Sequence, residues 1–240
     1  MNSKSIFTNI YKNQIWGDGS LLKPFSGSGS NPVNAAPYAK FVKETISDYK
    51  ITSVVDLGHG DWAMWGDYRF LGVNYCGLDI AEGLSNQNSI FYNSSNLKFI
   101  EIKPYQKLPE SELLISKDVL QHLSFNEIDF YLKEFRKYKY IILCNDIFIP
   151  LSFTKKLKNI FQVKQRLIKL FDSKNPFYKP KVLRNNVDIQ SGDYRGLDLD
   201  KLILNLGYKN FQLIRKLQFD GPARIGIKKE VLLYINVNIV

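Results

Sequence analysis

The chain has 240 residues, of which 45% are apolar and 14% aromatic. This length and apolar content allow a substantial core, which excludes a disordered chain and favours one elaborated domain. Two cysteines exclude a disulfide scaffold and a Cys-rich zinc module. Because Cys76 and Cys144 lie in apolar runs, we expect buried free thiols and a cytoplasmic location. No window reaches 18 apolar residues and the start lacks a signal-peptide core, so we expect no transmembrane span.

The positive charge of the chain is concentrated in one segment. Residues 133–184 contain 14 Lys and Arg against 3 Asp and Glu, whereas the remaining residues contain 19 against 20. A net charge of +10 first suggests a nucleic acid or an acidic surface as partner. Because the excess positive charge lies in residues 133–184, we assign it to one basic segment of an otherwise neutral protein.

The predicted elements alternate between strands and helices. Residues 1–37 are expected to form an irregular N-terminal arm, which is followed by a helix over 38–49. A second helix is predicted over 124–137, where Ser124 and Glu127 form a capping box. The predicted strands in this part cover residues 51–57, 74–80, 97–102, 113–116 and 140–144. This alternation predicts a mostly parallel sheet with helices on both faces.

The C-terminal part departs from this alternation. The segment 151–184 is rich in Lys and Arg and has apolar residues at helical spacing between them. This pattern predicts a basic amphipathic helix inserted in the chain. A helix over 197–206 and strands over 211–219 and 231–237 follow, with the two strands as antiparallel neighbours at one edge. We therefore expect a single domain with a Rossmann-like, seven-stranded α/β sheet. Its expected parts are an arm (1–37), a cofactor-binding core (38–149), a basic helical insertion (150–184) and a C-terminal part (185–240).

The most informative local pattern is a glycine turn that follows the first strand. In Asp56-Leu57-Gly58-His59-Gly60-Asp61 a buried strand runs into Gly-x-Gly and then into a predicted helix, and such glycines let backbone approach a ligand closely. Asp79 lies about 20 residues further on, so the turn also fits a dinucleotide-binding pattern. A third alternative is a turn that binds no ligand.

Three details favour S-adenosylmethionine over a dinucleotide. Asp56 places a carboxylate near the turn, which suits a sulfonium cofactor with an α-amino group and repels a pyrophosphate. Asp61 and Trp62 crowd the helix N-terminus that a pyrophosphate would need. The two final strands suit a seven-stranded sheet with an antiparallel hairpin edge.

The chain resembles the class I S-adenosylmethionine-dependent methyltransferases. The motifs that carry the resemblance are DLGHGD, CGLDI and LLISKDVLQHL, at the ends of the first, second and fourth strands. A narrower resemblance, through FTNIYKNQIWG, DVLQHLS and NNVDIQSGDYRGLDL, is to a bacterial subgroup associated with surface-polysaccharide (capsule or lipopolysaccharide) biosynthesis. It covers residues 7–149 and 185–237.

The resemblance implies a set of cofactor-binding residues. Asp79 would accept the ribose hydroxyls, Ile80 would pack beside the adenine, and Glu101 would face the adenine amino group. Tyr11, Trp16 and Ser28 belong to the arm, which would fold over the cofactor as a lid or pack as an ordinary arm. The remaining members of the set are Asp56, Gly58, His59, Gly60, Ser116 and Lys117, around the methionine end and the sulfonium.

Asp118 and His122 are the best acid/base candidates. Their i, i+4 spacing places them on one face of a helical turn. In methyl transfer to a hydroxyl, His122 would remove the proton and Asp118 would orient the imidazole. The alternative is that His122 supports the loop without touching substrate. Asp146, Tyr194 and Arg195 are the candidate substrate-binding residues. No spacing indicates a metal site.

The predicted function is O-methylation of a sugar or its phosphate-type substituent, with N-methylation as the less favoured alternative. S-adenosylhomocysteine would be the product. The basic insertion would recognise an anionic glycan acceptor, contact an anionic membrane at its inner face, or only pack on the core. An RNA methyltransferase and a non-catalytic cofactor-binding protein are the alternatives from other classes, although no stacking motif for RNA is present. The oligomeric state is left open.

Overall fold

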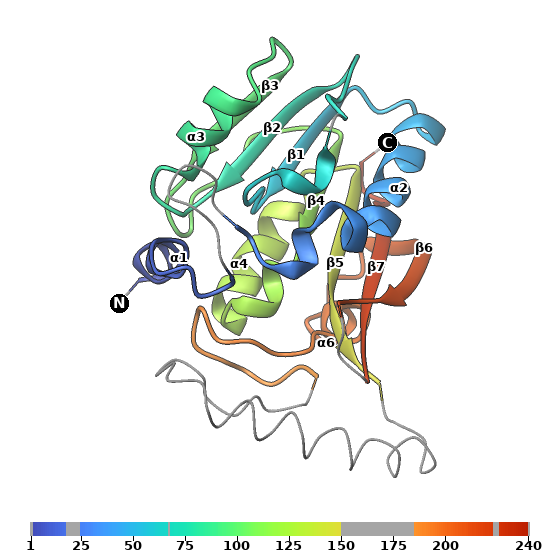
Figure 1. Cartoon of the computed structure of the whole chain (residues 1–240). Helices are drawn as coiled ribbons and strands as arrows, with labels where there is room; N and C mark the ends of the chain where they lie inside the picture. The colour runs from blue at the N-terminus through green and yellow to red at the C-terminus, as the bar shows by residue number, and fades with distance from the viewer. Residues whose placement is uncertain (1, 18–24, 67, 150–184, 223–225, 240) are drawn as a thin grey trace.

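The computed structural model describes residues 2–17, 25–66, 68–149, 185–222 and 226–239. These residues form a seven-stranded sheet with the strand order β3-β2-β1-β4-β5-β7-β6 (Figure 1). The strands from β3 to β5 pair in parallel, whereas β7 pairs antiparallel with both β5 and β6. The strands are β1 (Ser53–Leu57), β2 (Asn74–Asp79), β3 (Leu97–Glu101), β4 (Leu113–Lys117), β5 (Tyr140–Phe148), β6 (Phe211–Asp220) and β7 (Ile227–Asn236). The predicted fold class, including its antiparallel edge, is confirmed.

Helices cover both faces of the sheet, as predicted. The α-helices are α1 (Ser3–Lys12), α2 (Pro32–Asp48), α3 (Leu84–Phe91), α4 (Phe125–Phe135) and α6 (Leu199–Asn205), and the 3-10 helices are η1 (Ser28–Ser30), η2 (Ala63–Trp65) and η3 (Leu120–His122).

Each face has its own hydrophobic core. On one face, Phe7 of α1, Ile128 of α4 and Ile203 of α6 belong to a cluster with apolar residues of the sheet. On the other face, Phe41 of α2 and Trp65 of η2 belong to a second cluster, with the strand residues whose side chains point to that face. Because the buried strands are covered on both sides, their side chains are apolar almost throughout.

Two local predictions are wrong. The N-terminal arm begins with α1 rather than irregular chain, since Asn2 caps the helix by accepting from the Ser5 N–H. The glycine turn leads into the three-residue η2 instead of an α-helix. Trp62, in the left-handed conformation at φ 58°, and Gly66 at φ 54° flank η2 and prevent its extension.

The capping box predicted for α4 is present. The Ser124 hydroxyl accepts from the Glu127 N–H, and the Glu127 carboxylate accepts from the Ser124 N–H at 2.9 Å. The predicted amphipathic helix of the basic insertion lies outside the described residues. Within the described ranges, no helix is long and apolar enough to cross a membrane.

We predict that Ser124→Ala lowers the free energy of unfolding by about 1 kcal/mol, because it removes the N-cap of α4. Urea denaturation measures this loss. Ser47→Ala, an exposed substitution inside α2, is the matched control and should change stability by less than about 0.5 kcal/mol. Equal effects of the two substitutions would contradict the capping role.

Candidate functional site

A cavity of about 250 Å³ opens at the carboxyl ends of β1, β2 and β4, where ligands of open parallel sheets bind. Residues of the arm, the glycine turn, the loop after β4 and the segment before β7 meet in its wall. Among the predicted site residues, Tyr11, Trp16, Ser28, Gly58, His59, Gly60, Asp79, Ile80, Lys117, Asp118, His122, Asp146 and Tyr194 line the cavity.

The glycine turn is closely packed against two neighbouring segments. Gly58, at φ 80°, donates its N–H to the Leu78 carbonyl at 2.7 Å, and a Cβ there would lie 2.1 Å from Val119 Cγ2. Gly60, at φ 58°, donates its N–H to the Asp79 carboxylate at 3.1 Å. A Cβ at Gly60 would lie 2.5 Å from Ser26 Oγ, so both positions require glycine for conformation and for space.

Asp79 ends β2 beside the glycine turn. Its second carboxylate oxygen accepts the Ala81 N–H at 2.9 Å, so backbone on both sides fixes the side chain. The residue is 92% buried and lines the cavity, together with the apolar Ile80, Ile102 and Pro104. A carboxylate held in this way can accept hydrogen bonds from ligand hydroxyls.

His59 joins the glycine turn to α3. Its Nδ1 lies 2.7 Å from the Gly60 carbonyl and its Nε2 lies 2.9 Å from the Ser85 hydroxyl. Burial lowers the pKa of His59, which favours the neutral imidazole. In that state Nδ1–H donates to Gly60 and Nε2 accepts from Ser85. His59 therefore has a role in holding the turn, in addition to lining the cavity.

Three predicted cofactor residues do not line the cavity. Asp56 lies behind the turn, where its carboxylate accepts from the Tyr75 hydroxyl at 2.6 Å. Ser116 donates to the Leu57 carbonyl at 3.0 Å and thereby ties β4 to β1. Glu101 pairs with Lys4 at 2.5 Å, so its carboxylate is held by α1 rather than turned toward the cavity.

The predicted Asp118–His122 pair is not formed in the expected way. Asp118 is in the left-handed conformation at φ 61°, and His122 ends the 3-10 helix η3, so the i, i+4 geometry of an α-helix does not apply. Asp118 instead forms ion pairs with Lys117, at 2.6 Å, and with Lys229. Burial raises the pKa of Asp118, but these two lysines outweigh burial and hold this pKa well below its ordinary value.

His122 is oriented by backbone instead. Its Nδ1 lies 2.8 Å from the Asp193 carbonyl, and Nε2 lies 3.4 Å from the Gln121 amide nitrogen. An Nδ1–H that donates to a carbonyl leaves Nε2 as the basic atom. The ring centroid lies 5.6 Å from that of Trp16 and 5.7 Å from that of Tyr194, so the imidazole is set between aromatic rings.

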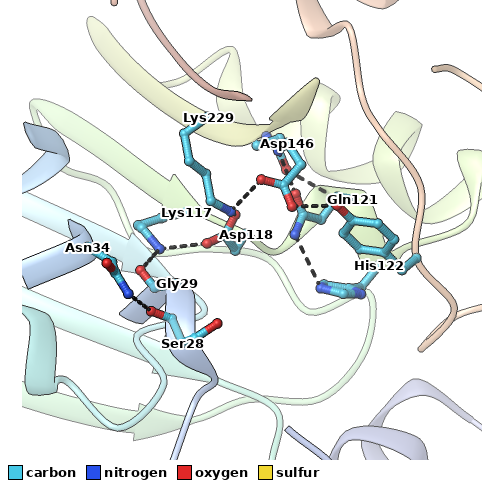
Figure 2. Close-up of polar contacts among 11 residues, drawn as sticks. Ser28, Gly29, Asn34, Lys117, Asp118, Gln121, His122, Asp146 and Lys229 are labelled. Carbon is cyan, nitrogen blue, oxygen red and sulfur yellow. Dashed lines mark hydrogen bonds and ion pairs between the residues drawn. The ribbon is translucent and has the colours of Figure 1, made fainter. Parts of the chain in front are cut away.

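The strands β5 and β7 supply a further group of charged residues (Figure 2). Lys229 Nζ lies 2.8 Å from the Asp146 carboxylate, whose other oxygen accepts from the Tyr194 hydroxyl at 2.6 Å. Burial lowers the pKa of Lys229, but Asp118 and Asp146 outweigh burial and hold this pKa well above its ordinary value. Lys229 is not among the residues predicted from the sequence. It shares every second position along the strand with Val231 and Leu233, which are buried, and this spacing was the signal that could have indicated it.

Arg195 does not line the cavity, contrary to its predicted role in substrate binding. Its side chain is 99% buried, its guanidinium donates to the Leu120 carbonyl at 3.3 Å, and it lies 4.9 Å from the centre of the Phe125 ring. The neighbouring Tyr194 takes the cavity-facing position. Arg195 therefore supports the loop from behind.

The arm lies against the glycine turn and the end of β4. Ser26 donates its N–H to the Asp61 carboxylate at 2.8 Å and receives the Asp61 N–H at 2.6 Å. Tyr11 contacts the same serine at 2.9 Å, and Lys117 Nζ donates to the Gly29 carbonyl at 2.9 Å. These contacts form one wall of the cavity from residues far apart in the sequence. Over the part of the chain that the structure describes, no group of His, Cys, Asp and Glu side chains is arranged to hold a metal.

Comparisons with known proteins show the same fold. Magnesium protoporphyrin IX methyltransferase from Synechocystis PCC 6803, with S-adenosylhomocysteine bound, has a TM-score of 0.60 at 15% identity, over 98% of this chain and 100% of that one. N-methyltransferase NodS from Bradyrhizobium japonicum WM9, also with S-adenosylhomocysteine, has a TM-score of 0.59 at 8% identity, over 98% and 99%. An S-adenosylmethionine-dependent methyltransferase from Methanosarcina mazei has a TM-score of 0.53 at 16% identity, over 80% and 97%.

A scan of protein-family models finds no match, and a search of curated proteins finds none either. The structural neighbours named above are S-adenosylmethionine-dependent methyltransferases, and this chain has their Rossmann-like fold. At these identities, the likeness establishes the fold alone.

The buried carboxyl of Asp56 predicts a pH dependence of stability. Burial raises its pKa from 3.8 to about 7, so the folded protein binds this proton more tightly than the unfolded chain does. The group therefore lowers wild-type stability as pH rises through this interval, by at most about 1.4 kcal/mol per pH unit.

Asp56→Asn removes this titration while keeping an acceptor for Tyr75. We predict that the stability of the variant relative to wild type increases from about pH 4 to about pH 7, as urea denaturation at several pH values would measure. A difference that is the same at every pH would contradict the raised pKa of Asp56.

Proposed function

We propose that the protein is an S-adenosylmethionine-dependent methyltransferase. The observation that carries this proposal is the Gly58–Gly60 turn, which presents its backbone at the cavity beside the carboxylate of Asp79. The turn lies at the carboxyl end of β1, in a chain with the fold of known methyltransferases. Transfer of the methyl group to an acceptor would release S-adenosylhomocysteine.

The residues present fit this cofactor. Asp79 offers fixed carboxylate oxygens for the ribose hydroxyls. Gly58 lines the cavity with backbone alone, because Val119 packs where its Cβ would lie. The apolar side chains of Ile80 and Ile102 suit an adenine ring. Tyr11, Trp16 and Ser28, from the arm, would cover the bound cofactor as a lid.

A dinucleotide fits this site less well. The glycine turn is followed by η2, a single 3-10 turn, rather than by the α-helix whose N-terminus would bind a pyrophosphate. The Asp61 carboxylate accepts the N–H groups of Ser26 and Ala63, so these donors are already engaged.

For the acceptor, we propose a sugar hydroxyl in capsule or lipopolysaccharide biosynthesis. The basis is the resemblance of the arm and loop motifs to the polysaccharide-associated subgroup. His122, with Nε2 as its basic atom, would remove the hydroxyl proton in an in-line transfer, and alignment would supply much of the rate. Asp118 and Lys117 would shape the site beside the reacting group. The basic insertion would bring the protein to an anionic glycan or to the inner face of the membrane.

We predict that wild type binds S-adenosylhomocysteine in calorimetric titration and that Asp79→Ala weakens this binding at least about tenfold, because it removes a charge-assisted acceptor for the ribose. Glu82→Gln, which changes an exposed carboxylate three residues away, is the control and should bind as wild type does. Absence of binding by wild type would contradict the proposed cofactor.

The acceptor class is tested with radiolabelled S-adenosylmethionine and a bacterial extract separated into glycan, RNA and protein fractions. We predict label in the glycan fraction, and a loss of about 10²-fold or more in rate for His122→Asn. Label in RNA alone would support the alternative of an RNA methyltransferase. Cofactor binding without labelling of any fraction would support a non-catalytic cofactor-binding protein.

A further inference from the structure

Four charged side chains form a buried cluster at one end of the cavity. This charge cluster consists of Lys117 at the end of β4, Asp118 directly after it, Asp146 in β5 and Lys229 in β7 (Figure 2). The exposed fractions of the two lysine side chains are 2% and 5%. Asp146 and Lys229 are direct partners in the β5–β7 register, so the sheet itself brings these two groups together.

The charge cluster is balanced and internally paired. Lys117 pairs with Asp118, and Lys229 pairs with both Asp118 and Asp146. Each cation is therefore neutralised by a carboxylate within the protein. In such a buried network, a change that removes one partner leaves an uncompensated charge, which is costly.

This balance favours an uncharged ligand group over an anion. A phosphate or carboxylate would bring a further negative charge beside Asp146 and would have to displace it from Lys229. A hydroxyl group needs no such displacement, because a carboxylate oxygen has lone pairs for a further donor and an ammonium has three N–H donors. A pair of hydroxyls can donate to Asp146 and accept from Lys229 at once.

The wall next to the charge cluster is aromatic. Tyr194 donates to Asp146 and lies beside His122, which in turn lies beside Trp16. Large rings near a few fixed polar groups are typical of sites for compact organic ligands. They offer an apolar surface for the C–H face of a sugar ring whose hydroxyls reach the charged residues.

We infer that the acceptor presents an uncharged polyhydroxyl group, such as neighbouring hydroxyls of a neutral sugar ring, to Asp146, Lys229 and the aromatic wall. This inference rests on the proposed methyltransferase function and narrows its acceptor at the reacting end. Recognition of any anionic part of the acceptor would then take place outside the charge cluster.

The test uses the full chain saturated with S-adenosylhomocysteine and ligand-observed NMR titration. The uncharged probes are the methyl pyranosides of glucose, galactose and mannose, and the anionic probes are the corresponding hexose phosphates and inorganic phosphate. We expect at least one neutral glycoside to bind wild type about tenfold more tightly than any anionic probe, because the anion must break a buried ion pair.

Asp146→Asn gives the charge cluster a net positive charge. This substitution should weaken the binding of the neutral glycoside and strengthen the binding of phosphate, each about tenfold. The preference for the neutral probe over the anionic one then reverses. Asp48→Asn, which changes an exposed carboxylate outside the cavity, is the control and should keep the wild-type order. The affinity for S-adenosylhomocysteine should stay the same in both variants.

Three results would overturn the inference. They are anionic probes binding wild type as tightly as neutral ones, no neutral glycoside binding up to its solubility limit, and a large loss of S-adenosylhomocysteine affinity in Asp146→Asn. The last result would assign the cluster to the cofactor. Failure of wild type to bind S-adenosylhomocysteine would instead contradict the proposed function itself, so the two failures are distinguishable.

Discussion

The backbone of the Gly58–Gly60 turn is the point at which the separate parts of the site are joined. Its N–H groups are taken by the Leu78 carbonyl and the Asp79 carboxylate at the end of β2, and Val119 of the loop after β4 packs where a Cβ would lie. The arm reaches the same turn through Ser26 and Asp61. A side chain at Gly58 would therefore displace the loop after β4 and disturb the cofactor and acceptor ends together.

Electrostatics divides the cavity into two regions. At the turn, Asp79 is a carboxylate held by backbone donors, ready for ligand hydroxyls. At the other end, lysines and aspartates neutralise one another. His122 lies beside Tyr194, and the Asp193 carbonyl sets the orientation of its ring. The charge excess of the chain lies largely in residues 133–184, most of which follow β5. The described wall of the cavity therefore has no excess of positive charge for an anionic partner.

Much of the fold was predictable because buried parallel strands and capped helices have local signals. The strand-forming runs, the capping box at Ser124 and the antiparallel edge were each visible in the sequence. A position at the cavity was predictable where a residue ends a strand, as Asp79 does. It was not predictable where the direction of the side chain decides. Asp56 and Glu101 do not line the cavity, and Arg195 is buried behind the loop that carries Tyr194. Lys229 was missed because its partners, Asp118 and Asp146, are over 80 residues away and meet it only through sheet pairing.

We propose that this cavity binds S-adenosylmethionine with its adenosine at the ends of β1 and β2. The most direct test is a crystal structure of the protein with S-adenosylhomocysteine. We expect the ribose hydroxyls within hydrogen-bonding distance of the Asp79 carboxylate and the cofactor in contact with the backbone of Gly58 and Gly60. A ligand bound elsewhere, or a ribose that leaves Asp79 without contact, would contradict it.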